Sequence, residues 1–270
     1  MTYTYHILMS NINGLASTNR QHMLEEFIQK HDVDIAVLQE VTSVHNITIK
    51  GYQIDNIGTA GHGTATLTRD DLQMHRIRRL PSGQGLAAYY NNICLVNIYA
   101  PSGTSNLAER EDFFISEVTD LLPLAPTELI MAGDFNCVQS DSDCTEQRYS
   151  SRSLDKVTQG LCLVDVWDAS LNAQAFTHYT LTGAARLDRI YVSDSIRKNK
   201  QGVETLAAAF TDHLAVILRV QLSIPFTHWG RGRWCMNTSY LVESHFQDKL
   251  KIEWTEWKKH IPRYQSIVHW

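Results

Sequence analysis

The sequence predicts an α/β fold in which a mixed-sheet sandwich carries its helices on the outside. Short apolar runs typical of strands recur through residues 1–222, and only a few helix-like segments separate them. A purely parallel sheet would need a helix between nearly every pair of strands. The chain has 270 residues, of which 43% are hydrophobic, so it can bury a substantial core without disulfides or a structural metal.

Strand and helix candidates alternate through the first hundred residues. Thr18 can cap a helix, because the apolar residues between Met23 and Ile28 fall on one face of it. A short apolar run ends directly at Gln39 and Glu40. The strands expected here cover residues 6–9, 35–38, 64–68, 86–90 and 93–99, with Gly and Asn turns between the later ones.

The pattern continues as far as residue 222. Residues 107–122 predict a helix with a charged outer face that Pro123 ends, and residues 153–161 predict another. Strands at 129–132, 164–167, 187–192 and 215–220 complete the predicted domain.

Residues 223–270 have a different character. The stretch 228–234 is basic, aromatic and interrupted by glycine, as a linker would be. Apolar residues then recur at roughly helical spacing, namely Tyr240, Leu241, Phe246, Leu250, Trp254 and Trp257. We therefore expect a domain over 1–222, followed over 223–270 by a linker and a partial helix. The apolar face of that helix is unmatched, so the natural chain is expected to continue.

The net charge of −5 is unevenly distributed. Residues 1–222 carry −8 and residues 223–270 carry +3. Because DNA-binding domains are usually basic, the sequence predicts weak autonomous DNA affinity for residues 1–222. Part of their acidity can serve a metal site.

The sequence also carries information about compartment. It begins without the basic and apolar segments of a signal peptide, and no apolar run reaches membrane-spanning length. Its five cysteines are scattered without a CxxC pair, which is typical of reduced thiols. We expect an intracellular protein with no membrane partner.

Polar side chains follow several predicted strands at their carboxyl ends, where sheet proteins commonly place active sites. Asp188 lies within a further strand and Tyr99 ends another. The clusters are Asn11-Ile12-Asn13-Gly14, Gln39-Glu40, Gly133-Asp134-Phe135-Asn136 and Thr211-Asp212-His213. Glu40 and Asp212 with an Asn oxygen would hold Mg²⁺, which prefers oxygen ligands. This inventory suits phosphodiester hydrolysis.

The remaining residue types fit the same reaction. Asp134 can orient and deprotonate an attacking water while Asn136 aligns it. His213, as an imidazolium, can donate to a phosphate oxygen, and Asp188 would keep it oriented and charged.

Each motif also has a purely structural alternative. Gly133-Asp134-Phe135-Asn136 alone is as compatible with a turn as with a site, because Gly, Asp and Asn are common turn formers. Glu40 could be a solvated strand end, and Tyr99 a buried aromatic with a satisfied hydroxyl. Asp212-His213 could cap a helix. The joint order of the motifs and their strand-end positions favour a site.

In this order the motifs resemble the exonuclease–endonuclease–phosphatase superfamily, which includes DNase I, abasic-site endonucleases and inositol polyphosphate phosphatases. The resemblance covers essentially residues 1–222. It implies a two-sheet α/β sandwich like that of DNase I and one principal Mg²⁺ site, with Mn²⁺ as the alternative ion. It rests on Asn11-Ile12-Asn13-Gly14-Leu15, Leu38-Gln39-Glu40, Asn97-Ile98-Tyr99-Ala100-Pro101, Gly133-Asp134-Phe135-Asn136, Arg186-Leu187-Asp188-Arg189-Ile190 and Thr211-Asp212-His213.

The resemblance implies a role for each matching residue. The metal-site residues are Asn11, Glu40 and Asp212; the phenol contacting the scissile phosphate is Tyr99; the water-activating pair is Asp134 with Asn136; and the Asp–His dyad is Asp188 with His213. Thr211 stands where the family often has Ser, and it retains the hydroxyl.

Within the superfamily, the sequence looks most like the endonucleases of LINE-type non-LTR retrotransposons. Asn13 stands where repair endonucleases often show Asp, and residues 186–193 and 232–237 resemble the LINE-type pattern. The resemblance implies an enzyme that nicks one strand of double-stranded DNA in the nucleus. The freed 3′-hydroxyl would prime reverse transcription of the element's RNA by the remainder of the polyprotein.

Residues 177–186 predict a hairpin beside the site. We expect it to enter a DNA groove and influence target choice, with Arg186 near a phosphate or a minor-groove edge. His178, Asn13 and Thr211 are the other expected DNA contacts. A plain surface hairpin is the alternative.

Three other functions share the motifs. An abasic-site repair endonuclease, or a small-substrate phosphoesterase acting on a phosphoinositide or sphingomyelin, would use the same chemistry. Lipid-acting relatives would be expected to carry a membrane-docking loop or a Lys/Arg cluster, which residues 1–222 lack. A decayed copy acting as an inactive binding module would be expected to have lost motif residues, and none is lost.

Overall fold

The computed structural model describes residues 2–42, 47–59, 62–72, 74–90, 93–123, 128–146, 149–167, 176–222 and 244–258. Within these ranges no helix is long and apolar enough to cross a membrane. The chain divides into two compact units, Met1–Thr227 and His228–Trp270. The second unit contains helix α6 (Ser244–Lys258), on which Ile252 and Trp254 are exposed. The expected linker at 228–234 and the motif at 232–237 lie outside the described residues.

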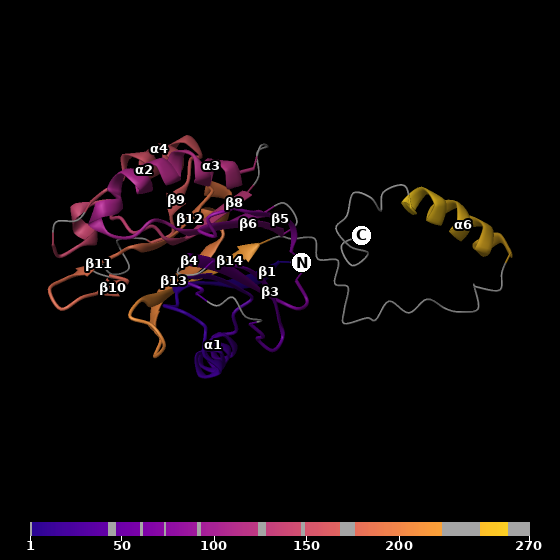
Figure 1. Cartoon of the computed structure of the whole chain (residues 1–270), viewed down its shortest axis with the longest axis horizontal. Helices are drawn as coiled ribbons and strands as arrows, with labels where there is room; N and C mark the ends of the chain where they lie inside the picture. The colour runs from indigo at the N-terminus through magenta and orange to yellow at the C-terminus, as the bar shows by residue number, and fades with distance from the viewer. Residues whose placement is uncertain are drawn as a thin grey trace. The chain divides into compact units, whose positions relative to one another are not determined.

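The first unit consists of two six-stranded sheets with helices on their outer faces (Figure 1). The strand orders are β13-β14-β1-β2-β4-β3 and β5-β6-β7-β8-β12-β9, and β10 and β11 form a separate hairpin. The predicted two-sheet α/β sandwich is therefore confirmed. The bounds are β1 Tyr3–Asn11, β2 Ile35–Gln39, β3 Tyr52–Thr59, β4 His62–Arg69, β5 His75–Arg79, β6 Gly85–Tyr90, β7 Ile93–Tyr99, β8 Glu128–Asp134, β9 Val164–Asp165, β10 His178–Tyr179, β11 Ala184–Ala185, β12 Asp188–Val192, β13 Lys200–Ala207 and β14 Leu214–Leu222.

The core between the sheets is built from alternate side chains of the buried strands. Met9 and Val37 of the first sheet belong to the same buried cluster as Leu95 and Ile130 of the second. Burying such a side chain contributes roughly 1.5–3 kcal/mol. One buried polar bridge also joins the sheets, because the Gln39 amide donates to Asn97 Oδ1 at 2.8 Å.

Helix α1 (Thr18–Lys30) covers the outer face of the first sheet through the buried Leu24 and Ile28 (Figure 1). Its N-cap is Ser17, whose hydroxyl accepts from the Arg20 amide at 3.3 Å. The prediction of Thr18 as the cap was therefore one residue too late. Both residues carry a capping hydroxyl, so the sequence alone did not distinguish them.

Three helices cover the outer face of the second sheet: α2 (Leu107–Ile115), α3 (Glu117–Leu121) and α4 (Arg152–Gly160) (Figure 1). The single helix predicted over 107–122 is wrong, because it divides at Ser116. The Ser116 hydroxyl donates to Asp112 Oδ1 at 3.0 Å, and Thr119 Oγ1 donates to the Ile115 carbonyl. Such local side-chain hydrogen bonds compete with the helical backbone pattern.

The sequence failed to predict three strands, β3, β5 and β13, and each is the outermost strand of its sheet. In β5 every residue except Ile77 is exposed. An edge strand packs on one neighbour only, so it needs no apolar run. The strand predicted over 164–167 is also shorter, since β9 covers only Val164–Asp165. Helix α5 (Asp194–Lys198), a single turn between β12 and β13, was likewise not predicted.

Candidate active site

The candidate residues converge at one end of the sandwich, because neighbouring strands end there together. β1 runs parallel to β2, which places Asn11 opposite Gln39. β7 runs parallel to β8, which places Tyr99 opposite Asp134. β12 is antiparallel to β8, so its first residue, Asp188, is the register partner of Asp134.

The segment Thr211-Asp212-His213 reaches the same rim in a different way from the one predicted. It lies at the amino end of β14 rather than at the carboxyl end of an apolar strand. Because β14 is antiparallel to β1, its amino end lies beside the carboxyl end of β1. The Thr211 hydroxyl donates to the Asn11 carbonyl at 2.8 Å and accepts from the His213 amide at 3.1 Å.

Asn11 connects two carboxylates of the site. Its Nδ2 donates to Glu40 Oε1 at 2.9 Å and to Asp134 Oδ2 at 3.0 Å, while its Oδ1 accepts from the Asn13 amide at 3.1 Å. The Tyr99 hydroxyl also donates to Glu40 Oε1, at 2.9 Å. Both donors contact Oε1, so neither of them occupies Glu40 Oε2. Asn11, expected as a metal ligand, thus holds Glu40 and Asp134 in place.

The Tyr99 phenol remains a hydrogen-bond donor. Burial, followed by the negative charge of Glu40, raises its pKa well above the ordinary value. A protonated phenol beside a carboxylate is suited to contact a phosphate oxygen.

Asp188 and His213 form the expected dyad. His213 Nδ1 lies 2.8 Å from Asp188 Oδ2, and both residues are buried. Burial alone would lower the pKa of His213, but the adjacent Asp188 outweighs it and raises that pKa to about 10. The imidazole is therefore cationic at neutral pH.

Thr177 supports this dyad and was missed by the sequence analysis, which noted it only as the start of a hairpin. Its buried hydroxyl oxygen accepts from the backbone amides of Leu187 and Asp188, each at 3.1 Å. Its carbonyl accepts from the Leu214 amide at 2.7 Å. It therefore joins the segments that carry both members of the dyad.

Asp134 is, like Asp188, a fully buried carboxylate of the site. Burial, followed by the charge of Asp188, raises its pKa, and its Oδ1 accepts from the Asn136 amide at 3.0 Å. Asp188 Oδ1 is buried with no hydrogen-bond partner among the described residues. One ligating atom from each of Asp134, Asp188 and His213 lies within 4.8 Å of the others. Because His213 is cationic, the two carboxylates are the members of this group that could bind a metal ion.

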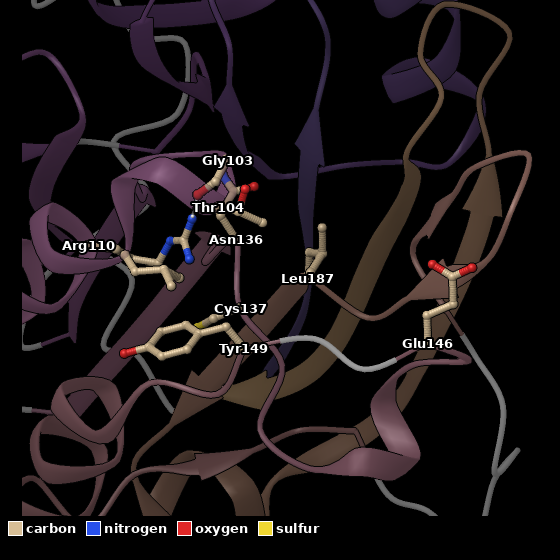
Figure 2. Close-up of a pocket in the computed structure, with 9 residues that line it drawn as sticks. Gly103, Thr104, Arg110, Asn136, Cys137, Glu146, Tyr149 and Leu187 are labelled. Carbon is tan, nitrogen blue, oxygen red and sulfur yellow. Dashed lines mark hydrogen bonds between the residues drawn. The ribbon is translucent and has the colours of Figure 1, made fainter.

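A pocket of about 380 Å³ adjoins Asn136 (Figure 2). Asn136 Nδ2 donates to the Ala100 carbonyl at 2.9 Å, which holds the amide at the pocket wall. Arg110 and Tyr149 line the pocket with it, and Glu146 lies on the other side of Leu187 in this view. The pocket places polar and aromatic groups next to the amide expected to align water.

The hairpin of β10 and β11 stands beside the dyad, as predicted. The His178 ring lies 4.6 Å from the His213 ring between centroids, and its Nε2 lies 3.9 Å from Asp212 Oδ2. Asp212 itself is at the rim, with a side chain 59% exposed. Both residues thus face the site.

Arg186 occupies a different position from the one expected. Its guanidinium pairs with Asp143 at 2.6 Å and Asp165 at 3.2 Å, and its side chain is only 15% exposed. The expectation that Arg186 reaches a phosphate or a groove edge is therefore corrected. Its partners lie 43 and 21 residues away along the chain, so no local motif indicated the pairing.

Residues 10–213 match the Endonuclease/Exonuclease/phosphatase family. The chain belongs to this family. The matched range includes every candidate site residue from Asn11 to His213. Nucleases and phosphatases of the family are hydrolases that act on phosphodiester bonds.

The resemblance to transposon proteins is also confirmed. The chain is 27% identical over 291 residues to the transposon TX1 uncharacterized 149 kDa protein of Xenopus laevis, in an alignment covering 96% of this chain. It spans 21% of that relative's length.

Solved structures of two AP endonucleases and a 3′ phosphatase share the fold. The AP endonuclease LMAP of Leishmania major superposes with a TM-score of 0.63 at 19% identity, covering 81% of this chain and 88% of that one. A 3′ phosphatase of Neisseria bound to a product DNA hairpin gives 0.62 at 18% identity, with coverages of 80% and 99%. An AP endonuclease of Archaeoglobus fulgidus gives 0.63 at 15% identity, with coverages of 79% and 98%.

Proposed function

We propose that this chain is a Mg²⁺-dependent DNA endonuclease that nicks one strand of a target duplex and leaves a 3′-hydroxyl. In a retrotransposon polyprotein, that hydroxyl would prime reverse transcription of the element's RNA. The observation that carries the proposal is the convergence of Asp134, Asn136 and the Asp188–His213 dyad at one rim of a family fold. The similarity to a transposon protein supports the biological setting.

The site residues divide the chemistry among themselves. Asp134 accepts a proton from the attacking water, and its raised pKa gives it the basicity that this needs at neutral pH. Asn136 aligns the water. His213, cationic beside Asp188, donates to a phosphate oxygen, where it stabilises developing negative charge. The Tyr99 hydroxyl, which donates to Glu40 in this structure, would contact the scissile phosphate.

The residues present fit a hard divalent cation. Glu40 and Asp134 are held by the same Asn11 amide, and Asp212 brings an exposed carboxylate to the rim. The buried and unpartnered Asp188 Oδ1 indicates additional capacity for positive charge in the site. We propose Glu40, Asp212 and the Asn11 oxygen as Mg²⁺ ligands, with Mn²⁺ as the alternative ion. The ion would neutralise charge on the phosphate.

We expect double-stranded DNA to approach over the hairpin. Leu181 at its tip is fully exposed and Tyr179 is 52% exposed, so both side chains are accessible to a partner. Asn13, Thr211 and His178 lie on the DNA-facing side in this proposal. The action would take place in the nucleus.

The test is nicking of supercoiled plasmid by the purified chain. Open circles are expected with Mg²⁺ and none with EDTA, and both Asp134→Ala and His213→Ala should lose the activity. His22→Ala is the matched control, because His22 is an exposed histidine on α1 that pairs with the equally exposed Glu26.

The outcomes separate the rival functions. An intact plasmid together with cleaved abasic duplex would indicate a repair endonuclease. Hydrolysis of inositol phosphates alone would indicate a small-substrate phosphoesterase. Inertness on all three substrates would favour an inactive binding module and overturn the proposal.

A further inference from the structure

Four charged side chains form a buried cluster next to the end of β11: Asp143, Asp165, Arg186 and Arg189, here termed the ion-pair cluster. Their side chains are 5%, 11%, 15% and 1% exposed, respectively. The two guanidinium groups balance the two carboxylates. None of these residues has a part in the chemistry proposed above.

Each arginine bridges both carboxylates. Arg189 donates to Asp143 Oδ2 at 2.6 Å and to Asp165 Oδ2 at 2.7 Å. Arg186 donates to Asp143 Oδ1 at 2.6 Å and to Asp165 Oδ2 at 3.2 Å. Charge-assisted contacts at these distances fix orientation as well as distance, because the guanidinium is a planar fork.

The cluster joins two segments that carry site residues. Arg186 and Arg189 flank Leu187 and Asp188, so the dyad carboxylate is anchored on both sides. Asp143 belongs to the segment that leads away from Asn136, and its Oδ2 also accepts from the Gln139 and Ser140 amides at 3.1 and 2.9 Å. The segments that carry Asn136 and Asp188 are thereby both held by the ion-pair cluster.

Backbone hydrogen bonds extend this connection to the hairpin. The Arg186 amide donates to the Asp143 carbonyl at 2.8 Å, and the Thr145 amide donates to the Ala184 carbonyl at 3.0 Å. Cys144 and Ala185 form a bridge between the two. The segment after Asn136 therefore lies along β11 as a third strand would.

Stability alone is a weak reason to bury these four charges. Replacing a buried ion pair by well-packed apolar residues is often neutral or stabilising, whereas removing one partner is strongly destabilising. Burial alone would raise the pKa of Asp143, but Arg189 and then Arg186 outweigh it and hold that pKa at about 2. Asp143 is thus ionised at neutral pH. What the cluster provides beyond an apolar core is the fixed orientation of its contacts.

We propose that the ion-pair cluster positions Asn136 and Asp188 for the reaction, with Asp143 as its central positioning residue. This inference rests on the proposed nuclease function. Its residues do not touch the substrate, so their removal is expected to lower kcat and to leave KM largely unchanged.

Two variants test the inference on a mapped plasmid substrate. Asp143→Asn removes the shared carboxylate, and a displacement of about 1 Å in the site is enough to lower kcat roughly 100-fold. Arg186→Lys keeps the charge at the most exposed member of the cluster but loses the forked contact, so it should fold and lower kcat less. Asp194→Asn is the matched control, because Asp194 pairs with Arg197 and Lys198 on the exposed helix α5.

Circular dichroism melting first establishes the temperature at which each variant is folded, and kcat and KM are measured there. A lower kcat with KM near the wild-type value, in Asp143→Asn and more mildly in Arg186→Lys, supports the positioning role. Wild-type kcat in a folded Arg186→Lys, or in a folded Asp143→Asn, overturns it. An inert wild-type chain would instead contradict the proposed function itself.

Discussion

At the scale of single residues, the site holds strained backbone. Asn13, Glu40 and Asn136 have φ values of +46°, +55° and +50°. Non-glycine residues in this left-handed region cost of order 1–3 kcal/mol each, although Asn tolerates it best. Contacts with the surrounding structure must therefore hold this backbone conformation. At Glu40, for example, the carbonyl accepts a hydrogen bond from the Gly14 amide at 2.9 Å. The backbone at three positions of the site is thus set before any substrate arrives.

The dyad predicts a pH dependence of stability. Asp188 raises the pKa of His213 from 6.5 to about 10. The resulting stabilisation is fully present below the unfolded-state pKa and is lost as pH rises through the folded-state value. Between pH 6.5 and 10, the wild-type free energy of unfolding should therefore fall faster than that of His213→Gln. The difference is at most about 1.4 kcal/mol per pH unit. Urea unfolding at several pH values measures this, and parallel curves for the two proteins would contradict it.

Thr177 supports the dyad through one oxygen atom. Thr177→Val keeps the shape but leaves the buried amides of Leu187 and Asp188 without that acceptor. An unsatisfied buried donor costs about 1–3 kcal/mol, so a loss of roughly 2 kcal/mol in the free energy of unfolding is expected. Thr177→Ser retains the acceptor and should lose much less. Equal stability of the two variants in urea unfolding would rule out this role.

The candidate site was predictable where it depends on local sequence. Asp134 and Glu40 follow apolar runs directly, and their strands end at the same rim. The role of Thr177, the pairing of Arg186 and the presence of Asp143 were not predictable, because each depends on contacts between distant segments. For Asp143 and Arg189 that separation is 46 residues.

At the scale of elements, the parallel pairing of β7 with β8 depends on Gly133. A Cβ at this position would lie 1.9 Å from the Ile98 carbonyl oxygen, and its φ of +155° disfavours other residues. Gly133→Ala should therefore lose more than about 4 kcal/mol in the free energy of unfolding or prevent folding. Gly160→Ala is the control, because nothing lies within 4 Å of that Cβ and the residue ends helix α4. That change should be neutral or stabilising, and thermal melting of both proteins decides.

The hairpin tip predicts a change of target choice without loss of activity. Leu181 projects fully into solvent, whereas His178 at the base contacts the dyad. Leu181→Ser should shift the relative use of individual nicking sites by about tenfold, or 1.4 kcal/mol, at similar total nicking. Leu161→Ser, at an exposed leucine that follows α4, is the control. An unchanged nick map would show that the tip is a plain surface hairpin.

Interior strands were easier to predict than edge strands. β2 and β7 are buried at every residue, so their sequences are apolar except for Gln39 and Asn97. No residue of β13 is buried and nearly all of β5 is exposed, so neither strand shows an apolar run in the sequence. The ends of helices were also hard to predict, because they depend on which side chain caps the helix. Ser17 rather than Thr18 caps α1, and the helix predicted over 107–122 divides at Ser116.

At the scale of the whole molecule, the acidic sandwich and the basic segment occupy different parts of the chain. The sandwich lies in Met1–Thr227, and residues 228–270 form a second unit. Residues 228–270 contain seven Lys and Arg residues and four Asp and Glu residues, so this second unit is basic. An acidic catalytic unit followed by a basic segment is expected to place most of the electrostatic DNA affinity outside the nuclease fold.

A truncation to residues 1–227 tests this division. Its thermal midpoint should match that of the sandwich in the whole chain, because the core cluster lies within the first unit. Its affinity for a duplex should be weaker and less salt-dependent, since each lost phosphate contact removes about 0.9 from the slope of log K against log salt. Fluorescence anisotropy at several salt concentrations measures the slope. Lys249→Gln with Lys251→Gln on α6 provides an intermediate variant in the full chain. Equal slopes for the truncated and full chains would place the phosphate contacts on the sandwich itself, despite its net charge.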